Sequence, residues 1–250
     1  MRSSAVPSML RAIRWNLDRG TDDVRLFELG KTYSMGAKGV PEERCVLSLG
    51  ATGHRRSASV YDREAALDFF DLKGDLETVL GEFEVPDLVF EPSERPYLQP
   101  GRSGCLNSQG GGLAVFGLLQ QDLAREYKLR QQVWVAEIDF ERLVNFSLRT
   151  RKFQPLSKFP AVERDFSLVI PEELPYARLS SALAGLKEEE ICDFRAVDRF
   201  SGGPIPPNHY SLLLRVTFQS QTRTLTSEEL GELSQRLLNV LHGLGVKLRS

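Results

Sequence analysis

The stretch YSLLLRVTFQSQTRTLTSEELGELSQRLLNVLHGLGVKL, residues 210–248, decides the fold of the second half of the chain. Its first part, Tyr210 to Ser220, alternates apolar and polar residues with a period of two, which predicts a half-buried strand. Ser227 to Leu244 carries apolar residues at helical spacing, and Thr226 with Glu229 forms the capping-box pattern of a helix start. We therefore expect a strand, a long helix and a short final strand, in this order.

The segments before this stretch complete a known domain pattern. Val162 to Ile170 and Ile191 to Phe200 are typical of strands, and Tyr176 to Leu186 between them is typical of a helix. With the short strand at Val246 to Leu248, the order over residues 159–250 is β-α-β-β-α-β, the ferredoxin-like pattern. In this pattern both helices cover one face of the sheet, and the other face stays open for a ligand.

Period-two alternation assigns several side chains to that open face. Ser211 and Arg215 fall in the polar phase of one strand, and Ser167 falls in that of another. Phe200 faces the same way if Val197 points into the core. An exposed ring beside hydroxyls and a guanidinium is typical of single-stranded RNA recognition, because the ring can stack on a base. The alternative is that Phe200 caps the sheet edge and Arg215 is a solvated surface charge, and the pattern alone leaves both open.

The first half of the chain indicates a separate unit of mixed α and β structure. Val6 to Leu17 has the apolar spacing of an amphipathic helix. Val24 to Tyr33 and Arg44 to Ala51 predict a strand hairpin around a turn at Gly36 to Pro41, and Ala65 to Phe83 predicts a second helix. Further strands are expected at Pro86 to Phe90, Arg102 to Ser108, Leu113 to Leu119 and Val133 to Phe140, with a short helix at Gln121 to Tyr127.

A basic stretch containing proline separates the two halves. Residues 149–158 show no periodicity and carry several lysines and arginines. Such exposed, polar segments are where domain boundaries usually fall. We place a first unit at residues 1–148, a linker at 149–158 and a second domain at 159–250.

Composition narrows the classes of protein further. The 250 residues are 41% hydrophobic and 26% charged, as in an ordinary globular protein, and no apolar run is long enough for a membrane span. We expect a cytoplasmic protein without membrane contact, because a signal pattern is also missing. Cys45, Cys105 and Cys192 lack CxxC spacing and the three histidines lie far apart, so no metal site is predicted. The net charge of −2 means that any RNA contact must be local.

Several collinear motifs resemble one family. KFPAVERDFSLVI (Lys158 to Ile170) and VDRFSGGPIPPNHYSLLLRVTFQSQTRTLTSEEL (Val197 to Leu230) resemble the anticodon-binding domain that ends bacterial phenylalanyl-tRNA synthetase β subunits. Four earlier segments resemble the synthetase-like module that precedes that domain. They are MRSSAVPSMLRAIRWNLDRG (Met1 to Gly20), VRLFELGKTY (Val24 to Tyr33), DFFDLKGDLETVL (Asp68 to Leu80) and LQPGRSG (Leu98 to Gly104). The resemblance implies an α+β chain: a truncated, non-catalytic class II synthetase-like antiparallel sheet module, then a ferredoxin-like domain.

The resemblance also implies a function for the second domain, which in this family binds the anticodon stem and loop of tRNA(Phe). It places Ser167, Phe200 and Ser211 at base-contacting positions and Arg249 near the RNA, and the alternation adds Arg215. The family commonly has tyrosine where Phe200 stands. Stacking survives this difference, whereas a hydrogen bond from the phenol hydroxyl does not.

The first unit lacks the phosphate clamp of a class II synthetase. Such a site uses an arginine two residues before a glutamate, and a glycine-rich strand with another arginine, because charge develops on the phosphate during adenylation. The residue two before Glu28 is Leu26, and Gly112 to Tyr127 contains no such glycine-rich segment. We therefore expect no catalytic residue and no cofactor in this chain; ATP and Mg²⁺ would be used by the whole complex.

The partners implied by the resemblance are the catalytic α subunit of phenylalanine-tRNA ligase, in an (αβ)2 heterotetramer, and tRNA(Phe). The helices at Val6 to Leu17 and from Ala65 are the expected subunit contacts. Met1 would fall inside the synthetase-like module, just after its first motif, so we expect a truncated chain or an incomplete reading frame without the tRNA-binding and editing domains of full-length β subunits. Two other functions stay open: a free-standing ferredoxin-like regulatory or protein-interaction domain that does not bind RNA, and, less favoured, an independent acyl-adenylate enzyme.

Overall fold

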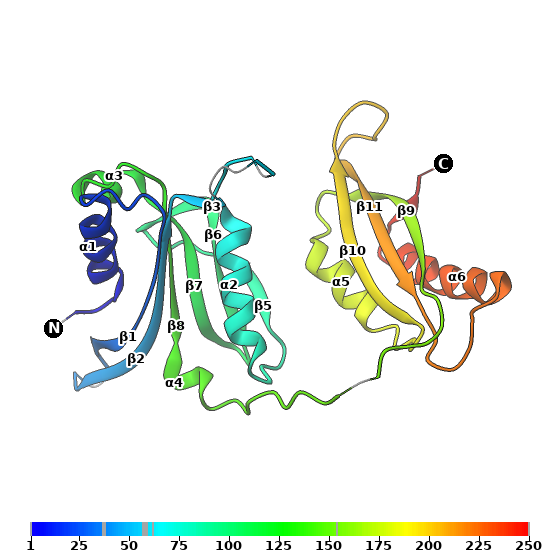
Figure 1. Cartoon of the computed structure of the whole chain (residues 1–250), viewed down its shortest axis with the longest axis horizontal. Coiled ribbons are helices and arrows are strands. Elements are labelled where there is room, and N and C mark those ends of the chain that lie inside the picture. Colours follow the sequence, from blue (N-terminus) through cyan, green and yellow to red (C-terminus); the bar gives the residue numbers. More distant parts are fainter. Residues whose placement is uncertain (1, 37–38, 57–59, 62, 154, 250) are drawn as a thin grey trace. The chain divides into compact units, whose positions relative to one another are not determined.

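The chain forms two compact units, Met1–Arg151 and Lys152–Ser250. The structure, a computed structural model, describes residues 2–36, 39–56, 60–61, 63–153 and 155–249 (Figure 1). Met1, residues 37–38 of the turn expected at Gly36 to Pro41, and residue 154 of the expected linker lie outside this description.

The first unit is built on a six-stranded antiparallel sheet with the order β1-β2-β8-β7-β6-β5. Helices α1 (Val6–Leu17) and α2 (Phe69–Gly81) lie on opposite faces of this sheet (Figure 1). The strands of the sheet are β1 (Val24–Met35), β2 (Pro41–Thr52), β5 (Val89–Pro92), β6 (Leu98–Ser108), β7 (Gly111–Leu119) and β8 (Val133–Asp139). Smaller elements are β3 (His54–Arg56), β4 (Ala65–Ala66), α3 (Gln121–Glu126) and α4 (Phe140–Leu143).

Both faces of the central strands are covered, which explains why β8 is apolar in both of its phases. Val135 packs in the same cluster as α1, whereas Trp134 and Ala136 pack in the cluster of α2. The close approach of α1 to β2 depends on Gly50, because a Cβ atom there would lie only 2.4 Å from Cγ of Met9. The sheet is therefore the middle layer of this unit.

The second helix of the first unit is shorter than its apolar pattern predicts. It begins at Phe69 rather than near Ala65, because Asp68 has extended backbone and caps the helix. The Asp68 carboxylate accepts hydrogen bonds from the backbone N–H groups of Phe70 at 2.8 Å and Asp71 at 3.1 Å. An N-cap of this kind satisfies backbone donors that have no partner inside the helix, and so sets where the helix starts.

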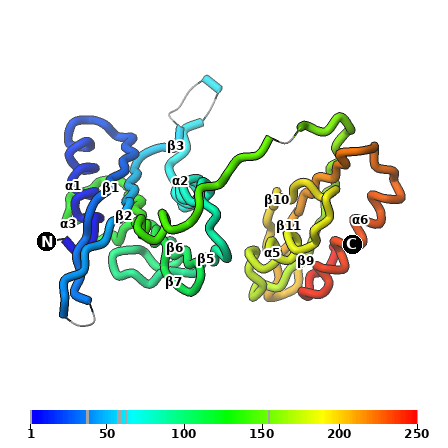
Figure 2. The backbone as a smooth tube through the Cα atoms, turned by 90° about the horizontal axis from the view of Figure 1, so that it is seen from below, coloured from blue at the N-terminus to red at the C-terminus, as the bar shows by residue number. Residues whose placement is uncertain are grey.

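The second unit has the predicted β-α-β-β-α-β order, and its antiparallel sheet has the order β10-β11-β9-β12 (Figures 1 and 2). Thr226 and Glu229 form the expected capping box at the start of the long helix. The elements are β9 (Val162–Pro171), α5 (Tyr176–Ala184), β10 (Ile191–Phe200), β11 (His209–Phe218), α6 (Ser227–Gly243) and β12 (Lys247–Leu248).

One core holds the second unit together. The apolar phase of β11, which includes Leu212 and Leu214, packs in one cluster with Leu179 of α5 and Leu237 of α6. Each fully buried leucine stabilises the fold by about 2 kcal/mol relative to an exposed one. Because both helices share the core with the same phase of β11, they cover one face of the sheet and leave the other open.

The ends of the stretch predicted as a linker are attached to the units that they border. The backbone N–H of Arg149 donates to the carbonyl oxygen of Glu82 at 2.7 Å, which ties it to the first unit. On the other side, Ser157 Oγ donates to the carbonyl oxygen of Ser220 at 2.7 Å. The division between the units falls after Arg151, inside the stretch 149–158.

Candidate nucleic-acid interface

The open face of the second unit is organised in cross-strand rows. Phe200 of β10, Ser211 of β11, Val169 of β9 and Lys247 of β12 are successive Cα partners across the four strands. Direct partners in antiparallel strands point to the same face. These four side chains therefore lie in one row, which we call the Phe200 row, on the face away from the helices.

The two predicted site residues of this row differ in exposure. The ring of Phe200 is 48% exposed, as stacking on a base requires, whereas Ser211 is only 5% exposed. Alternation predicts a solvent-facing Ser211, and this is wrong, because its short side chain lies between the larger side chains of Phe200 and Val169. The sequence pattern gives the face of a residue but not the size of its neighbours. A base contact by either residue stays a prediction.

Two more predicted residues lie in the next row of the same face. Ser167 is the Cα partner of Leu213, which in turn pairs with Asp198. The backbone N–H of Arg249 donates to the carbonyl oxygen of Ser167 at 2.7 Å, so the end of the chain continues alongside β9. The predicted site residues other than Arg215 thus gather at one end of the open face.

Arg215 lies apart from this group and is held by acidic side chains. It is four residues from Ser211 on β11, about 13 Å along the strand. Its Nε and Nη2 donate to the two carboxylate oxygens of Asp165 at 2.7 and 2.8 Å, and its Nη1 lies 3.4 Å from Glu163. The hydrogen bond from Arg215 lowers the pKa of Asp165, and the same contact raises the pKa of Arg215. The Arg215 guanidinium is therefore engaged by Asp165 and Glu163, and an RNA contact by Arg215 stays a prediction.

Strand β10 contains two irregularities that simple alternation misses. The pairing register shifts once beside Cys192 and again beside Val197. Together the two shifts displace the pairing by two residues, an even number, so Phe200 still reaches the open face, but Val197 is 46% exposed instead of pointing into the core. The three-residue spacing of Ile191 and Phe194, which both face the core partners of β11, breaks the period of two and was a usable signal for the first bulge.

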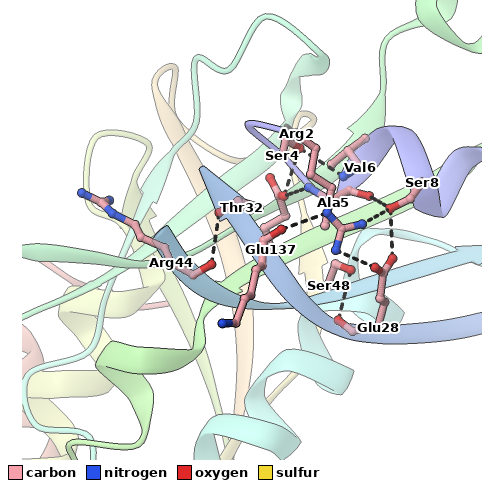
Figure 3. A network of polar contacts seen from close by, with 11 residues as sticks. Arg2, Ser4, Ala5, Val6, Ser8, Glu28, Thr32, Arg44, Ser48 and Glu137 are labelled. Carbon is pink, nitrogen blue, oxygen red and sulfur yellow. Dashed lines mark hydrogen bonds and ion pairs between the residues drawn. The ribbon is translucent and has the colours of Figure 1, made fainter. Parts of the chain in front are cut away.

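In the first unit, a polar network lies on the α1 side of the sheet (Figure 3). Glu28 of β1 forms an ion pair with Arg2 at 2.7 Å and accepts a hydrogen bond from Ser8 Oγ at 3.0 Å. The hydrogen bond from Arg2 lowers the pKa of Glu28 against the opposing effect of burial. Two residues earlier, Leu26 packs against the cluster that contains α1. The position where a class II site needs an arginine is thus an apolar packing position here.

A second carboxylate of this network fastens the chain before α1. Glu137 Oε1 accepts hydrogen bonds from the backbone N–H of Ala5 at 2.7 Å and from Ser4 Oγ at 3.0 Å (Figure 3). Its other oxygen lies 3.3 Å from the hydroxyl of Tyr97, whose pKa is raised by burial and by the charge of Glu137. These groups border a polar cavity of about 590 Å³ that also contains Arg44. Because Glu137 is already bound by the chain itself, its role in this network is to hold the N-terminal segment on the sheet.

Within the described ranges, His, Cys, Asp and Glu side chains do not gather in threes that could hold a metal ion. Among the described helices, none is both long and apolar enough to cross a membrane.

The antiparallel-sheet module followed by a ferredoxin-like domain with an open face defines a synthetase-type chain with an appended anticodon-binding domain. Residues 1–140 match the family model described as the phenylalanyl tRNA synthetase beta chain CLM domain, and residues 157–249 match the ferredoxin-fold anticodon binding domain. The chain belongs to the phenylalanyl-tRNA synthetase β chain family.

Known relatives agree with this membership. The chain is 32% identical over 251 residues to the phenylalanine–tRNA ligase β subunit of Symbiobacterium thermophilum, with all of this chain and 28% of the relative covered. The β subunit of Geobacter metallireducens is 30% identical, with 96% of this chain and 30% of the relative covered. The chain thus spans less than a third of the length of these relatives. A solved pyrrolysyl-tRNA synthetase from Desulfitobacterium hafniense aligns with a TM-score of 0.44 and 17% identity over 58% of this chain and 48% of its own.

Proposed function

We propose that the chain is the part of a phenylalanine–tRNA ligase β subunit that binds the anticodon region of tRNA(Phe) and supports assembly with a catalytic α subunit. The observation that supports the RNA contact is the half-exposed ring of Phe200 on the sheet face that no helix of this unit covers. Ser167 and Arg249 lie at the same end of that face. An aromatic ring with polar and cationic neighbours suits an unpaired base and its phosphate.

In this proposal the first unit does not catalyse adenylation. Leu26 is partly buried against the core where a phosphate-binding arginine would be needed, and Glu28 is bound by Arg2 and Ser8. A developing phosphate charge would therefore meet no preorganised cation at these two positions. ATP and Mg²⁺ would be used by the whole complex, a cytoplasmic (αβ)2 heterotetramer.

The edge strand β1 is a candidate for the subunit contact beside the two helices. Leu10 and Ile13 of α1 are fully buried inside their own unit, whereas Trp15 of α1 and Phe70 of α2 are 57% and 75% exposed. On β1, at the edge of the six-stranded sheet, Phe27 is 77% exposed and Leu29 is 53% exposed. Exposed apolar residues grouped on one strand are typical of interaction surfaces.

The test of the RNA contact is the affinity for a tRNA(Phe) anticodon stem-loop, measured by fluorescence anisotropy with the whole chain. Phe200→Ala should weaken binding by about 5- to 150-fold, since stacking contributes about 1–3 kcal/mol per base. Phe200→Tyr keeps the ring and serves as the matched control. Unchanged affinity of the alanine variant would contradict the stacking role, and equal binding of unrelated RNA would favour the regulatory-domain alternative.

The test of the other two parts of the proposal uses the purified chain and an α subunit. Co-purification with a cognate α subunit should succeed and should be weakened by Phe27→Asp. The chain alone should show no phenylalanine-dependent pyrophosphate exchange. Exchange by the isolated chain would contradict the non-catalytic role of the first unit.

A further inference from the structure

The Phe200 row extends across the whole sheet and ends at a lysine. Lys247 of β12 is the Cα partner of Val169, and Val169 is the partner of Ser211, which pairs with Phe200. The three inter-strand steps place the two ends of the row about 14 Å apart. Lys247 is exposed, and it lies on the open face because its row partners do.

The charges of the open face are distributed unevenly between its two ends. At the far end, Arg195 and Arg215 lie within 3.7 and 3.4 Å of Glu163, and Arg215 also binds Asp165. At the Phe200 end, the side chains of Lys247 and Arg249 make no ion pair with any acidic side chain that the structure describes. The acidic residues nearest to this end are Asp198 on β10, at the opposite edge of the sheet from Lys247, and the exposed Glu172, which follows β9 and whose backbone N–H donates to the carbonyl oxygen of Asn208.

This distribution of charge decides which end of the open face can bind the phosphates of an RNA strand. At the far end, a phosphate would have to displace two carboxylates: Asp165, which holds Arg215 in charge-assisted hydrogen bonds, and Glu163, which forms ion pairs with both arginines. At the Phe200 end, the lysine ammonium is free, and its aliphatic stem can lie along Val169 while the charge stays in solvent. A strand stacked on Phe200 is therefore drawn across the strands toward β12, not along them toward Arg215.

We propose that Lys247 binds a backbone phosphate of the RNA strand whose base stacks on Phe200, so that the anticodon loop crosses the sheet perpendicular to its strands. This inference rests on the proposed function and adds the path of the RNA and a phosphate subsite. The contact is to the sugar–phosphate backbone, so it positions the loop without reading its sequence. Arg215 and Asp165 act beside it as a closed pair that keeps the far end of the face unoccupied.

The first experiment measures how the affinity of the whole chain for the anticodon stem-loop depends on salt. Each phosphate contact to a single strand contributes about 0.7 to the slope of log affinity against log salt. Lys247→Gln should reduce the slope by about this amount, and Lys247→Arg should retain it. Arg178→Gln is the matched control, because it removes one exposed charge from α5, on the helix side of the sheet. A slope that changes equally in Lys247→Gln and Arg178→Gln overturns the inference.

The second experiment locates the phosphate. Neutral methylphosphonate linkages are placed one at a time in the loop of the RNA, and affinity is measured with the unaltered chain and with Lys247→Gln. One linkage should weaken binding to the unaltered chain and have no further effect in the variant. If every linkage has the same effect in both proteins, Lys247 binds no phosphate.

The two proposals fail in different ways. If the unaltered chain shows no preference for the stem-loop over unrelated RNA, the proposed function and this inference are both overturned. If the unaltered chain binds, and Phe200→Ala weakens binding while Lys247→Gln behaves as Arg178→Gln, only the path of the RNA across the sheet is overturned.

Discussion

Single residues on the open face show that the alternation of a strand predicts which face a side chain is on, but not whether the side chain is free to contact a ligand. Ser211 and Arg215 both lie on the face that alternation predicts, yet Ser211 is shielded within its row and Arg215 is bound by Asp165 and Glu163. Availability depends on neighbours from other strands. The same is true of Glu28, which could resemble a free carboxylate in the sequence but is held by Arg2 from the start of the chain.

Glu28→Gln should destabilise the first unit by about 1 kcal/mol at neutral pH, because it removes the charge that holds Arg2 in a half-exposed site. The pKa of Glu28 is lowered in the folded state, so its stabilising effect is present above the unfolded pKa near 4.5 and is lost as pH falls through the lower folded value. The difference between the two proteins should therefore shrink in acid. Denaturant unfolding followed by tryptophan fluorescence measures it selectively, because both tryptophans, Trp15 and Trp134, belong to the first unit.

The matched control for this prediction is Glu42→Gln. Glu42 also pairs with an arginine, Arg44 at 3.2 Å, but both side chains are largely exposed. Its removal should change the stability by a few tenths of a kcal/mol at most. Equal destabilisation by both variants, or a Glu28 effect that persists in acid, would argue against the role given to the Arg2–Glu28 pair.

At the scale of elements, some features are set by residues close together in the sequence and others by the pairing of distant strands. The start of α6 is set by residues three positions apart. Thr226 Oγ1 accepts a hydrogen bond from the backbone N–H of Glu229 at 3.2 Å, and the Glu229 carboxylate accepts one from the backbone N–H of Thr226 at 2.8 Å. The bulges of β10 are defined by the pairing with β11, and only the first has a local signal, the three-residue spacing of Ile191 and Phe194. The capping box was therefore predictable, whereas the second bulge and the full register of β10 were not.

Thr226→Ala should destabilise α6 by about 1 kcal/mol, because the N-cap hydrogen bond to Glu229 is lost. Amide hydrogen exchange along Ser227–Gly243 in the whole chain measures this directly, as faster exchange in the first turns of the helix. Ser227→Ala is the control, since Ser227 lies inside the helix and does not serve as its cap. Equal exchange rates in the two variants would show that the capping box does not stabilise the helix.

At the scale of the whole molecule, the chain consists of two units with separate cores. The apolar clusters of Met1–Arg151 and Lys152–Ser250 share no residue. Residues 151–153 are exposed and belong to no helix or strand. Each unit should therefore keep its fold when the connection is cut.

Limited trypsin digestion should cleave first after Arg151 or Lys152, because this backbone is exposed and a cut there breaks neither core. Mass spectrometry identifies the two fragments, and unchanged tryptophan fluorescence would show that the first unit stays folded after the cut. Earlier cleavage inside β1 to β8 or β9 to β12 would contradict the independence of the two units.

The amino-acid sequence by itself determined the order of elements in the second unit, its ferredoxin-like fold and the cap of α6. These features follow from spacing along the chain, since side-chain period and capping depend on residues a few positions apart. Only the tertiary structure decided that Ser211 is buried, that Arg215 is paired with Asp165 and that Lys247 completes the Phe200 row. Those outcomes depend on which strands become neighbours and in what register, and residues far apart in the sequence set both.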